Sequence, residues 1–161
     1  MATRCEERYA KMEEVAPKIV EQYFLEAKHP TAPGSKQAAA LMALAGILDA
    51  EKANAEVLSI EGARGFSTFY GYYMLQAMAK AGNYEGAMQV IRDFWGGMLD
   101  MGATSFWEDF NIDWLPNAAP IDELVPEGKK DIHGDFGAYC YEGFRHSLCH
   151  GWASGPTAWM I

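Results

Sequence analysis

The feature that most limits the fold is a Gly-Asn pair, Gly82-Asn83, between two segments of helical character. Ser67 can cap a helix over residues 68–81, and Gly82 can end it, because glycine readily adopts the left-handed conformation that closes a helix. Asn83 can cap a second helix over residues 84–99. Since a connection this short brings two helices back alongside each other, the sequence predicts an antiparallel helical hairpin.

Further helices are expected before this hairpin. Residues 36–48 are rich in Ala and Leu, which favour helix, and Ser35 is a plausible cap for them. Asp49 can cap the next helix, over residues 50–60. Strand signals are weak along the whole chain. We therefore expect an all-α fold built from helical hairpins, as a single domain over residues 1–161.

A long stretch without helical periodicity, residues 102–143, follows the hairpin. It is rich in Pro, Gly and Asp but also in aromatic residues, which is the wrong composition for disorder. Since connections this long are usually functional or disordered, we expect a long functional loop region over residues 102–143. Beyond it the run from Arg145 to Trp152 has helical character, and Ser154 with Pro156 suits the start of a last helix. The chain stops one turn later, and we expect truncation.

The charge balance argues against several classes of partner. The net charge is −9 and no cluster of Lys and Arg is visible, so we expect no nucleic-acid partner. No apolar run is long enough to span a bilayer and the first residues lack a signal-peptide core, so we expect no membrane partner. The compartment stays open. Cys5, Cys140 and Cys149 are compatible with free thiols under reducing conditions.

The run GATSFWEDFNIDW crowds acids and aromatic rings together and gives the first candidate site. Neighbouring rings can partly desolvate Glu108, which is how a general acid or base is commonly tuned. Trp107 and Trp114 could stack on the apolar face of a sugar. Asp109 and Asp113 could accept hydrogen bonds from its hydroxyl groups. The alternative is a surface loop with its acids outward and its rings inward, and spacing alone leaves both open.

The run HSLCH gives a second candidate site. In a helix, His146 and His150 would lie on one face, a spacing that can bind zinc. The other ligands would come from a nearby run: Asp131, His133 and Asp135. The alternative is that His150 packs beside Trp152 and hydrogen-bonds a substrate or a neighbour. Cys149 and His150 are not expected to form a nucleophile pair, because adjacent residues of a helix point in different directions.

A Gly-rich and aromatic run, EGARGFSTFYG over residues 61–71, precedes the first helix of the predicted hairpin. Its glycines predict a loop at this place. We expect that this loop could line the same pocket as Glu108.

Several stretches together resemble the C-terminal half of the catalytic domain of α-L-rhamnosidases, which form glycoside hydrolase family 78. They are SKQAAALMALAGIL, the run from GFSTFYG through GATSFWEDF, and SLCHGWASGPTAWM, which together span residues 35–161. The most specific pieces are Gly-Ala-Thr-x-x-Trp-Glu at 102–108 and Ser-x-x-His at 147–150. The resemblance implies an (α/α)6 barrel of six helical hairpins. It also implies an inverting enzyme that removes terminal α-linked L-rhamnose.

The resemblance also implies roles for single residues. Glu108 would be the catalytic base that activates water, His150 would line the sugar pocket, and Trp107 would form a pocket wall. The partner would be a carbohydrate with a terminal L-rhamnoside, with no cofactor and no metal. Which rhamnoside is cleaved stays open.

The chain departs from the family because the general acid of these enzymes lies upstream of the matched part, and residues 1–34 hold no counterpart. We therefore expect an incomplete toroid that carries one of the two catalytic carboxylates. Since such a toroid exposes apolar helix faces, we expect a homo-oligomer that covers residues 36–48 and the C-terminal TAWMI.

Two other functions stay open at this point. One is a non-catalytic helical module that binds carbohydrate, or acts as a scaffold, through Trp107 and Trp114. The other is a zinc-binding helical protein that uses His146 and His150.

Overall fold

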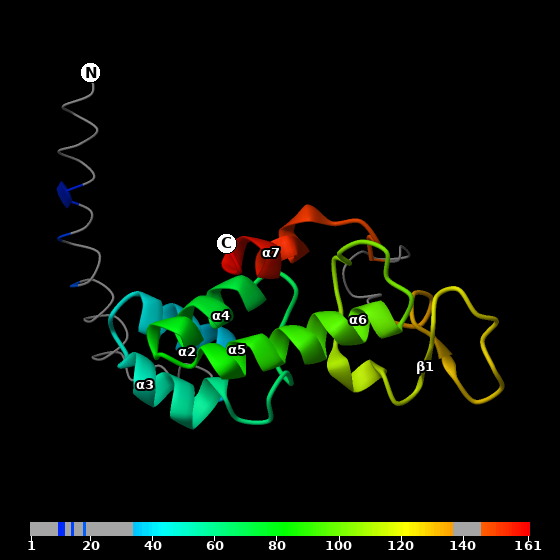
Figure 1. Ribbon diagram of the computed structural model, residues 1–161, viewed down its shortest axis with the longest axis horizontal. Helices are drawn as coiled ribbons and strands as arrows, with labels where there is room; N and C mark the ends of the chain where they lie inside the picture. The colour runs from blue at the N-terminus through cyan, green and yellow to red at the C-terminus, as the bar shows by residue number, and fades with distance from the viewer. Residues whose placement is uncertain (1–9, 12–13, 15–17, 19–33, 137–145) are drawn as a thin grey trace, which may run out of the picture.

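The computed structural model describes residues 10–11, 14, 18, 34–136 and 146–161. Its described part is mostly helical, with a single pair of two-residue strands, so the expected α class is confirmed. Figure 1 shows the helices gathered at one end of the molecule and the irregular segment that holds β1 at the other.

The helical end begins with three short helical segments, and the two caps predicted for them form. Helix α2 spans Lys36–Leu44, α3 spans Ala50–Ala53, and the π-helix η2 continues it over Asn54–Leu58. The side chain of Ser35 accepts a hydrogen bond from the N–H of Ala38, and the side chain of Asp49 accepts one from Lys52. Both bonds satisfy backbone donors that a helix start leaves unpaired.

The predicted hairpin is present. Helix α4 spans Gly71–Lys80 and α5 spans Tyr84–Val90, joined through Gly82 at φ +75°. The side chain of Asn83 accepts a hydrogen bond from Gly86 N–H, as expected of a cap. Helix α5 runs on through the π-helix η3 (Ile91–Trp95) into α6 (Gly96–Asp100), and Figure 1 shows these three as one long rod.

The start of α4 differs from the prediction. The helix begins at Gly71, not at residue 68, and Ser67 does not cap it with its side chain. The Ser67 hydroxyl accepts a hydrogen bond from the side chain of Gln37, and the hydroxyl of Thr68 donates to the main-chain oxygen of Glu108. These long-range bonds hold residues 67 and 68 in a turn, which local cap preference does not take into account.

The core lies between α2, α4 and the α5–α6 rod. Ala39, Ala40 and Ala43 of α2 are buried in it, and α2 packs on α4. The expectation that the face of residues 36–48 is left for a second copy is therefore wrong for these alanines, because α4 of the same chain covers them. Leu41 of α2 and Met160 near the C-terminus are exposed.

Residues 102–136 form the described part of the predicted loop region. They contain the 3-10 helix η4 (Ile112–Trp114) and two strands, β1 (Ala118–Ala119) and β2 (Lys130–Asp131). The strands pair in parallel, with Ala118 opposite Lys130. Phe110 and Ile132 are buried in the core. This region therefore packs against the helices as expected of an ordered loop, and its last part, residues 137–143, lies outside the described residues.

The C-terminal segment holds the 3-10 helix η5 (Gly151–Ser154) and helix α7 (Gly155–Trp159), which packs on α4. Pro156 lies in the first turn of α7, as predicted. The prediction that the preceding run is helical is wrong over 146–150, since His150 is extended at φ −131° and ψ 108°. Within the described part of the chain, no helix has the length and apolar character to cross a membrane.

Candidate functional site

Two segments far apart in the chain meet along their main chains and position the candidate site. The N–H of Glu108 donates to the carbonyl oxygen of Ser147 at 2.8 Å, and the N–H of His150 donates to that of Phe106, also at 2.8 Å. The hydroxyl of Ser105 donates to the Leu148 carbonyl oxygen at 2.5 Å. These bonds explain why residues 146–150 are not helical, because their backbone groups pair with the GATSFWE run instead.

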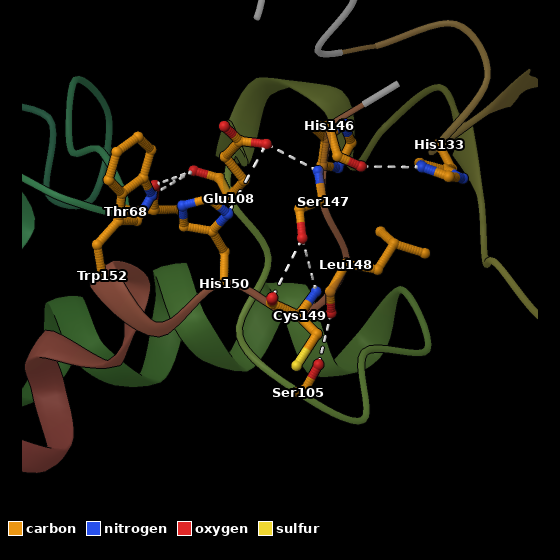
Figure 2. A network of polar contacts seen from close by, with 10 residues as sticks. All are labelled: Thr68, Ser105, Glu108, His133, His146, Ser147, Leu148, Cys149, His150 and Trp152. Carbon is orange, nitrogen blue, oxygen red and sulfur yellow. Dashed lines mark hydrogen bonds and ion pairs between the residues drawn. The ribbon is translucent and has the colours of Figure 1, made fainter. Parts of the chain in front are cut away.

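Glu108 is the buried carboxylate at this junction. The residue is 6% exposed, and its Oε2 accepts a hydrogen bond from the N–H of Ser147 at 2.8 Å. Figure 2 shows this oxygen turned toward Ser147 and His150. The other oxygen, Oε1, makes no hydrogen bond to a described residue and is not fully buried, although the side chain as a whole is only 4% exposed. One oxygen is thus anchored, and the other has no hydrogen-bond partner among the described residues.

His150 lies beside this carboxylate, with its Nδ1 atom 3.9 Å from Glu108 Oε2. Its ring also contacts that of Trp152, with centroids 4.2 Å apart. The indole N–H of Trp152 donates to the main-chain oxygen of Glu108 at 3.4 Å (Figure 2). The expectation that His150 packs beside Trp152 is therefore confirmed, and the imidazole is turned toward Glu108.

The loop of residues 61–71 reaches the same place. The Thr68 hydroxyl donates to the main-chain oxygen of Glu108, which also accepts from Trp152 (Figure 2). The loop was expected to share a pocket with Glu108, and the contact through Thr68 confirms that the two segments adjoin. Glu61 in this loop has φ +56°, uncommon for a residue with a side chain, so the loop path is held by its contacts.

His146 lies in a different environment from His150. It is buried, with its ring centroid 6.1 Å from that of Trp107 and 5.3 Å from that of His133. Burial lowers the pKa of His146, and the charge of Asp109 partly opposes this. Neither ring nitrogen makes a hydrogen bond of normal geometry to a described residue.

The predicted zinc geometry is not formed. His146 and His150 do not share a helix face, because the segment that carries them is extended. Across the ranges that the structure describes, no group of three or more His, Cys, Asp or Glu side chains is arranged to hold a metal ion. Asp131 instead accepts hydrogen bonds from the N–H groups of His133 and Gly134, as in a tight turn.

The aromatic residues of the GATSFWEDFNIDW run point inward. Trp107 is 1% exposed and belongs to the core, so the prediction that it forms a pocket wall is wrong in this structure. Trp114 is partly buried and stacks on Phe136, with centroids 4.8 Å apart. The rings of this run therefore agree with the alternative of a surface loop whose rings face inward. Burial stabilises large rings.

The two other acids of the run, Asp109 and Asp113, have different surroundings from Glu108 and do not contact it through a hydrogen bond. Asp109 is partly buried, and its Oδ2 is buried with no hydrogen-bond partner among the described residues. Asp113 is half exposed and accepts a hydrogen bond from Arg64 Nε at 2.6 Å. Their expected contacts with sugar hydroxyls remain predictions. Asp113 would have to accept a hydrogen bond from a sugar hydroxyl while it stays paired with Arg64.

Cavities of the described residues lie away from Glu108. An apolar cavity of about 280 Å³ between the α6 rod and α7 is lined by residues that include Trp95, Met98, Phe106 and Met160. A wider one of about 650 Å³ lies between α4, α5 and α7. Glu108 lines neither of these two cavities. Cys149 is a free, exposed thiol, whereas Cys5 and Cys140 lie outside the described residues.

Sequence patterns do not mark Phe69, Tyr70 and Trp152 as one surface, although all three are exposed near the site. The sequence does contain the residues that form this surface: an aromatic residue soon after His150 and a dense aromatic run after Thr68. Only the contact between these two segments turns them into neighbours.

Comparison with known proteins gives no relative. No family model matches the chain, no curated protein matches its sequence, and no solved structure matches its fold. The chemistry of the site is therefore argued from the arrangement around Glu108.

Proposed function

We propose that this chain supplies the general base of an inverting glycosidase that removes terminal α-L-rhamnose, and that Glu108 is that base. The observation that carries the proposal is the Glu108 carboxylate, whose Oε2 is held by Ser147 while Oε1 has no hydrogen-bond partner among the described residues. An inverting base needs a fixed carboxylate with a free oxygen directed at water. The resemblance to family 78 supplies the substrate class and the partial (α/α)6 barrel.

In the proposed step, a water molecule gives a proton to Oε1 of Glu108 while its oxygen bonds to the anomeric carbon. The bond from that carbon to the leaving oxygen breaks, and the leaving oxygen takes a proton from a general acid. His150, 3.9 Å from Oε2, is placed to hydrogen-bond a sugar hydroxyl next to this centre. A general acid would stand ~6.5–9.5 Å from the base in an inverting enzyme, and we assign that role to no residue of this chain.

The test uses a substrate that needs no general acid. α-L-Rhamnosyl fluoride has a leaving group that departs without protonation, so turnover depends on the base. We expect hydrolysis by the wild-type chain, with β-L-rhamnose as the first anomer by NMR. Glu108→Gln should lower kcat by roughly 10²–10⁴, the scale of losing a general base.

A matched control is Glu123→Gln, since Glu123 is an exposed carboxylate in the same irregular segment. It should keep wild-type turnover, and circular dichroism should show all three proteins folded. Turnover of Glu108→Gln close to wild type would contradict the assignment. So would a folded wild-type chain that does not hydrolyse the fluoride.

A non-catalytic carbohydrate-binding module is the second candidate, and exposed aromatic rings beside the site favour it. Such a module would bind sugars with similar affinity in the wild type and in Glu108→Gln. It would show no hydrolysis in either.

A further inference from the structure

Four aromatic residues form a continuous surface next to the candidate site, which we call the aromatic platform: Phe69, Tyr70, Tyr73 and Trp152. Ring centroids of Phe69 lie 5.0 Å from Tyr70, 6.0 Å from Tyr73 and 5.6 Å from Trp152. Phe69 is 40% exposed, Tyr70 37% and Trp152 49%. Single exposed rings are common, but rings in mutual contact at the surface form an apolar patch, and such patches mark binding sites.

The platform is held in place by close packing of two distant segments. Gly155 of α7 lies against Tyr72 of α4, where a Cβ on Gly155 would stand 2.8 Å from the Tyr72 Cβ. The indole N–H of Trp95 donates to the carbonyl oxygen of Ala153 at 3.1 Å. These contacts fix η5 beside the start of α4, so Trp152 and Phe69 meet in a defined arrangement.

Trp152 joins the platform to Glu108. Its indole N–H donates to the main-chain oxygen of Glu108 at 3.4 Å, and its ring lies 4.2 Å from that of His150. A molecule that covers the platform therefore comes next to the imidazole of His150, whose Nδ1 lies 3.9 Å from Oε2 of Glu108. Figure 2 shows Trp152, His150 and Glu108 side by side.

The chemistry of the platform disfavours an anionic partner and suits the apolar face of a sugar. Its members carry no charge, and the chain as a whole has a net charge of −9, which disfavours anionic partners. Aromatic faces are electron-rich and attract the C–H groups on the apolar face of a pyranose, while the tyrosine hydroxyls and His150 can bond its hydroxyl groups. A protein partner would need a much larger matching surface.

We propose that the aromatic platform binds a sugar ring of the substrate, adjacent to the glycosidic bond that Glu108 would act on. The identity of the sugar in this inference rests on the proposed function. The position of the sugar rests on the contact of Trp152 with Glu108. It makes Trp152 and Phe69 the main contributors to affinity, since they form the centre of the patch nearest to His150.

The experiment is isothermal titration calorimetry of the wild-type chain. Methyl α-L-rhamnoside and a rhamnosyl-glucose disaccharide are the ligands, and Kd is measured for each. Trp152→Ala and Phe69→Ala should each raise Kd about tenfold, which corresponds to roughly 1.4 kcal/mol. Tyr84→Ala is the matched control, because Tyr84 is an aromatic residue that is 60% exposed and lies outside the platform. It should leave Kd unchanged.

The outcomes separate this inference from the proposed base. Unchanged affinity in both Trp152→Ala and Phe69→Ala, with both proteins folded, overturns the platform and leaves the role of Glu108 standing. Weaker binding in these variants, together with full turnover by Glu108→Gln, supports sugar binding by the platform and contradicts the role of Glu108 as the base. Absence of saturable binding to the wild type also overturns the platform. If Trp152→Ala abolishes self-association in sedimentation without changing Kd, the platform is an interface between copies and the inference is wrong.

Discussion

The Glu108 side chain accepts a hydrogen bond from the main-chain N–H of Ser147, 39 positions later in the chain, at 2.8 Å. The N–H of Glu108 in turn donates to the carbonyl oxygen of Ser147. The residue proposed as the base is therefore also part of the join between the two motifs of the site. Variants at this position have to separate chemistry from structure.

A side chain without an acceptor at position 108 should destabilise the protein. Glu108→Gln keeps an oxygen for the N–H of Ser147, whereas Glu108→Leu leaves this donor unpaired. We expect a free energy of unfolding lower by about 1–3 kcal/mol in Glu108→Leu than in Glu108→Gln. Urea unfolding followed by circular dichroism measures the difference. Equal stability of the two variants would contradict the structural role of this bond.

The Thr68 hydroxyl should matter more than its methyl group. Thr68 is buried and donates to the main-chain oxygen of Glu108. Thr68→Val keeps the shape but loses the donor, and we expect a loss of about 1–2 kcal/mol in unfolding free energy. Thr68→Ser retains the hydroxyl and serves as the control. If thermal or urea unfolding ranks serine below valine, the packing of the methyl group outweighs the hydrogen bond.

His146 should make stability fall on mild acidification. Its pKa in the folded protein is below the ordinary 6.5, mainly because of burial. The unfolded chain therefore binds a proton more readily, so stability contributed by the neutral ring is full above pH 6.5 and decreases as pH falls below it. His146→Phe should weaken this dependence between pH 7 and about pH 5 in thermal unfolding scans. An identical pH profile in the variant would contradict this cause.

Lys36 should react unusually fast with acylating reagents. Burial lowers its pKa to about 8, although Glu61 opposes this, and its Nζ donates to the carbonyl oxygen of Gly62 at 2.5 Å. About half of the amine is neutral at pH 8, against less than about 1% for an ordinary lysine. Limited acetylation read by peptide mass spectrometry should modify Lys36 before the exposed Lys52 and Lys129. The opposite order would contradict the prediction and would mean that the burial of Lys36, which is 7% exposed, shields the amine more than the lower pKa activates it.

Self-association should depend on the C-terminal end rather than on α2. Met160 is 55% exposed and borders two cavities, whereas most of the alanines of α2 are covered within the chain. We expect a dimer in light scattering, and a shift toward monomer in Met160→Glu, because a charge is costly to bury in an apolar contact. Leu41→Glu, at an exposed site on α2, should leave the oligomeric state unchanged. A monomeric wild-type protein in light scattering would contradict this prediction.

Local rules predicted much of the helical part. The caps at Ser35, Asp49 and Asn83 form as expected, and Gly82 closes α4 in the left-handed conformation. Each of these features involves groups within a few residues of one another. Their energies are therefore similar in many tertiary surroundings, and a reader of the sequence can place them.

The same rules failed where distant segments compete for backbone groups. Residues 146–150 have helical character, but their N–H and C=O groups pair with Phe106 and Glu108. Ser67 has the right chemistry for a cap, but neighbouring Thr68 is held by Glu108. In both cases hydrogen bonds to a segment about 40 positions away replaced the local ones, and nothing in a short window of sequence records such a competitor.

The candidate site shows the same division. The motif at residues 102–108 identified Glu108 as a residue of interest, but it could not tell which of its neighbours point inward. Trp107 lies in the core, whereas Trp152 and Phe69 lie at the surface beside the carboxylate. Residue types and local caps follow from the order of amino acids alone. Which rings surround Glu108 depends on the packing of α7 against α4 and on the main-chain oxygen of Glu108 that Thr68 and Trp152 share, because these contacts between distant segments bring residues 69 and 152 together.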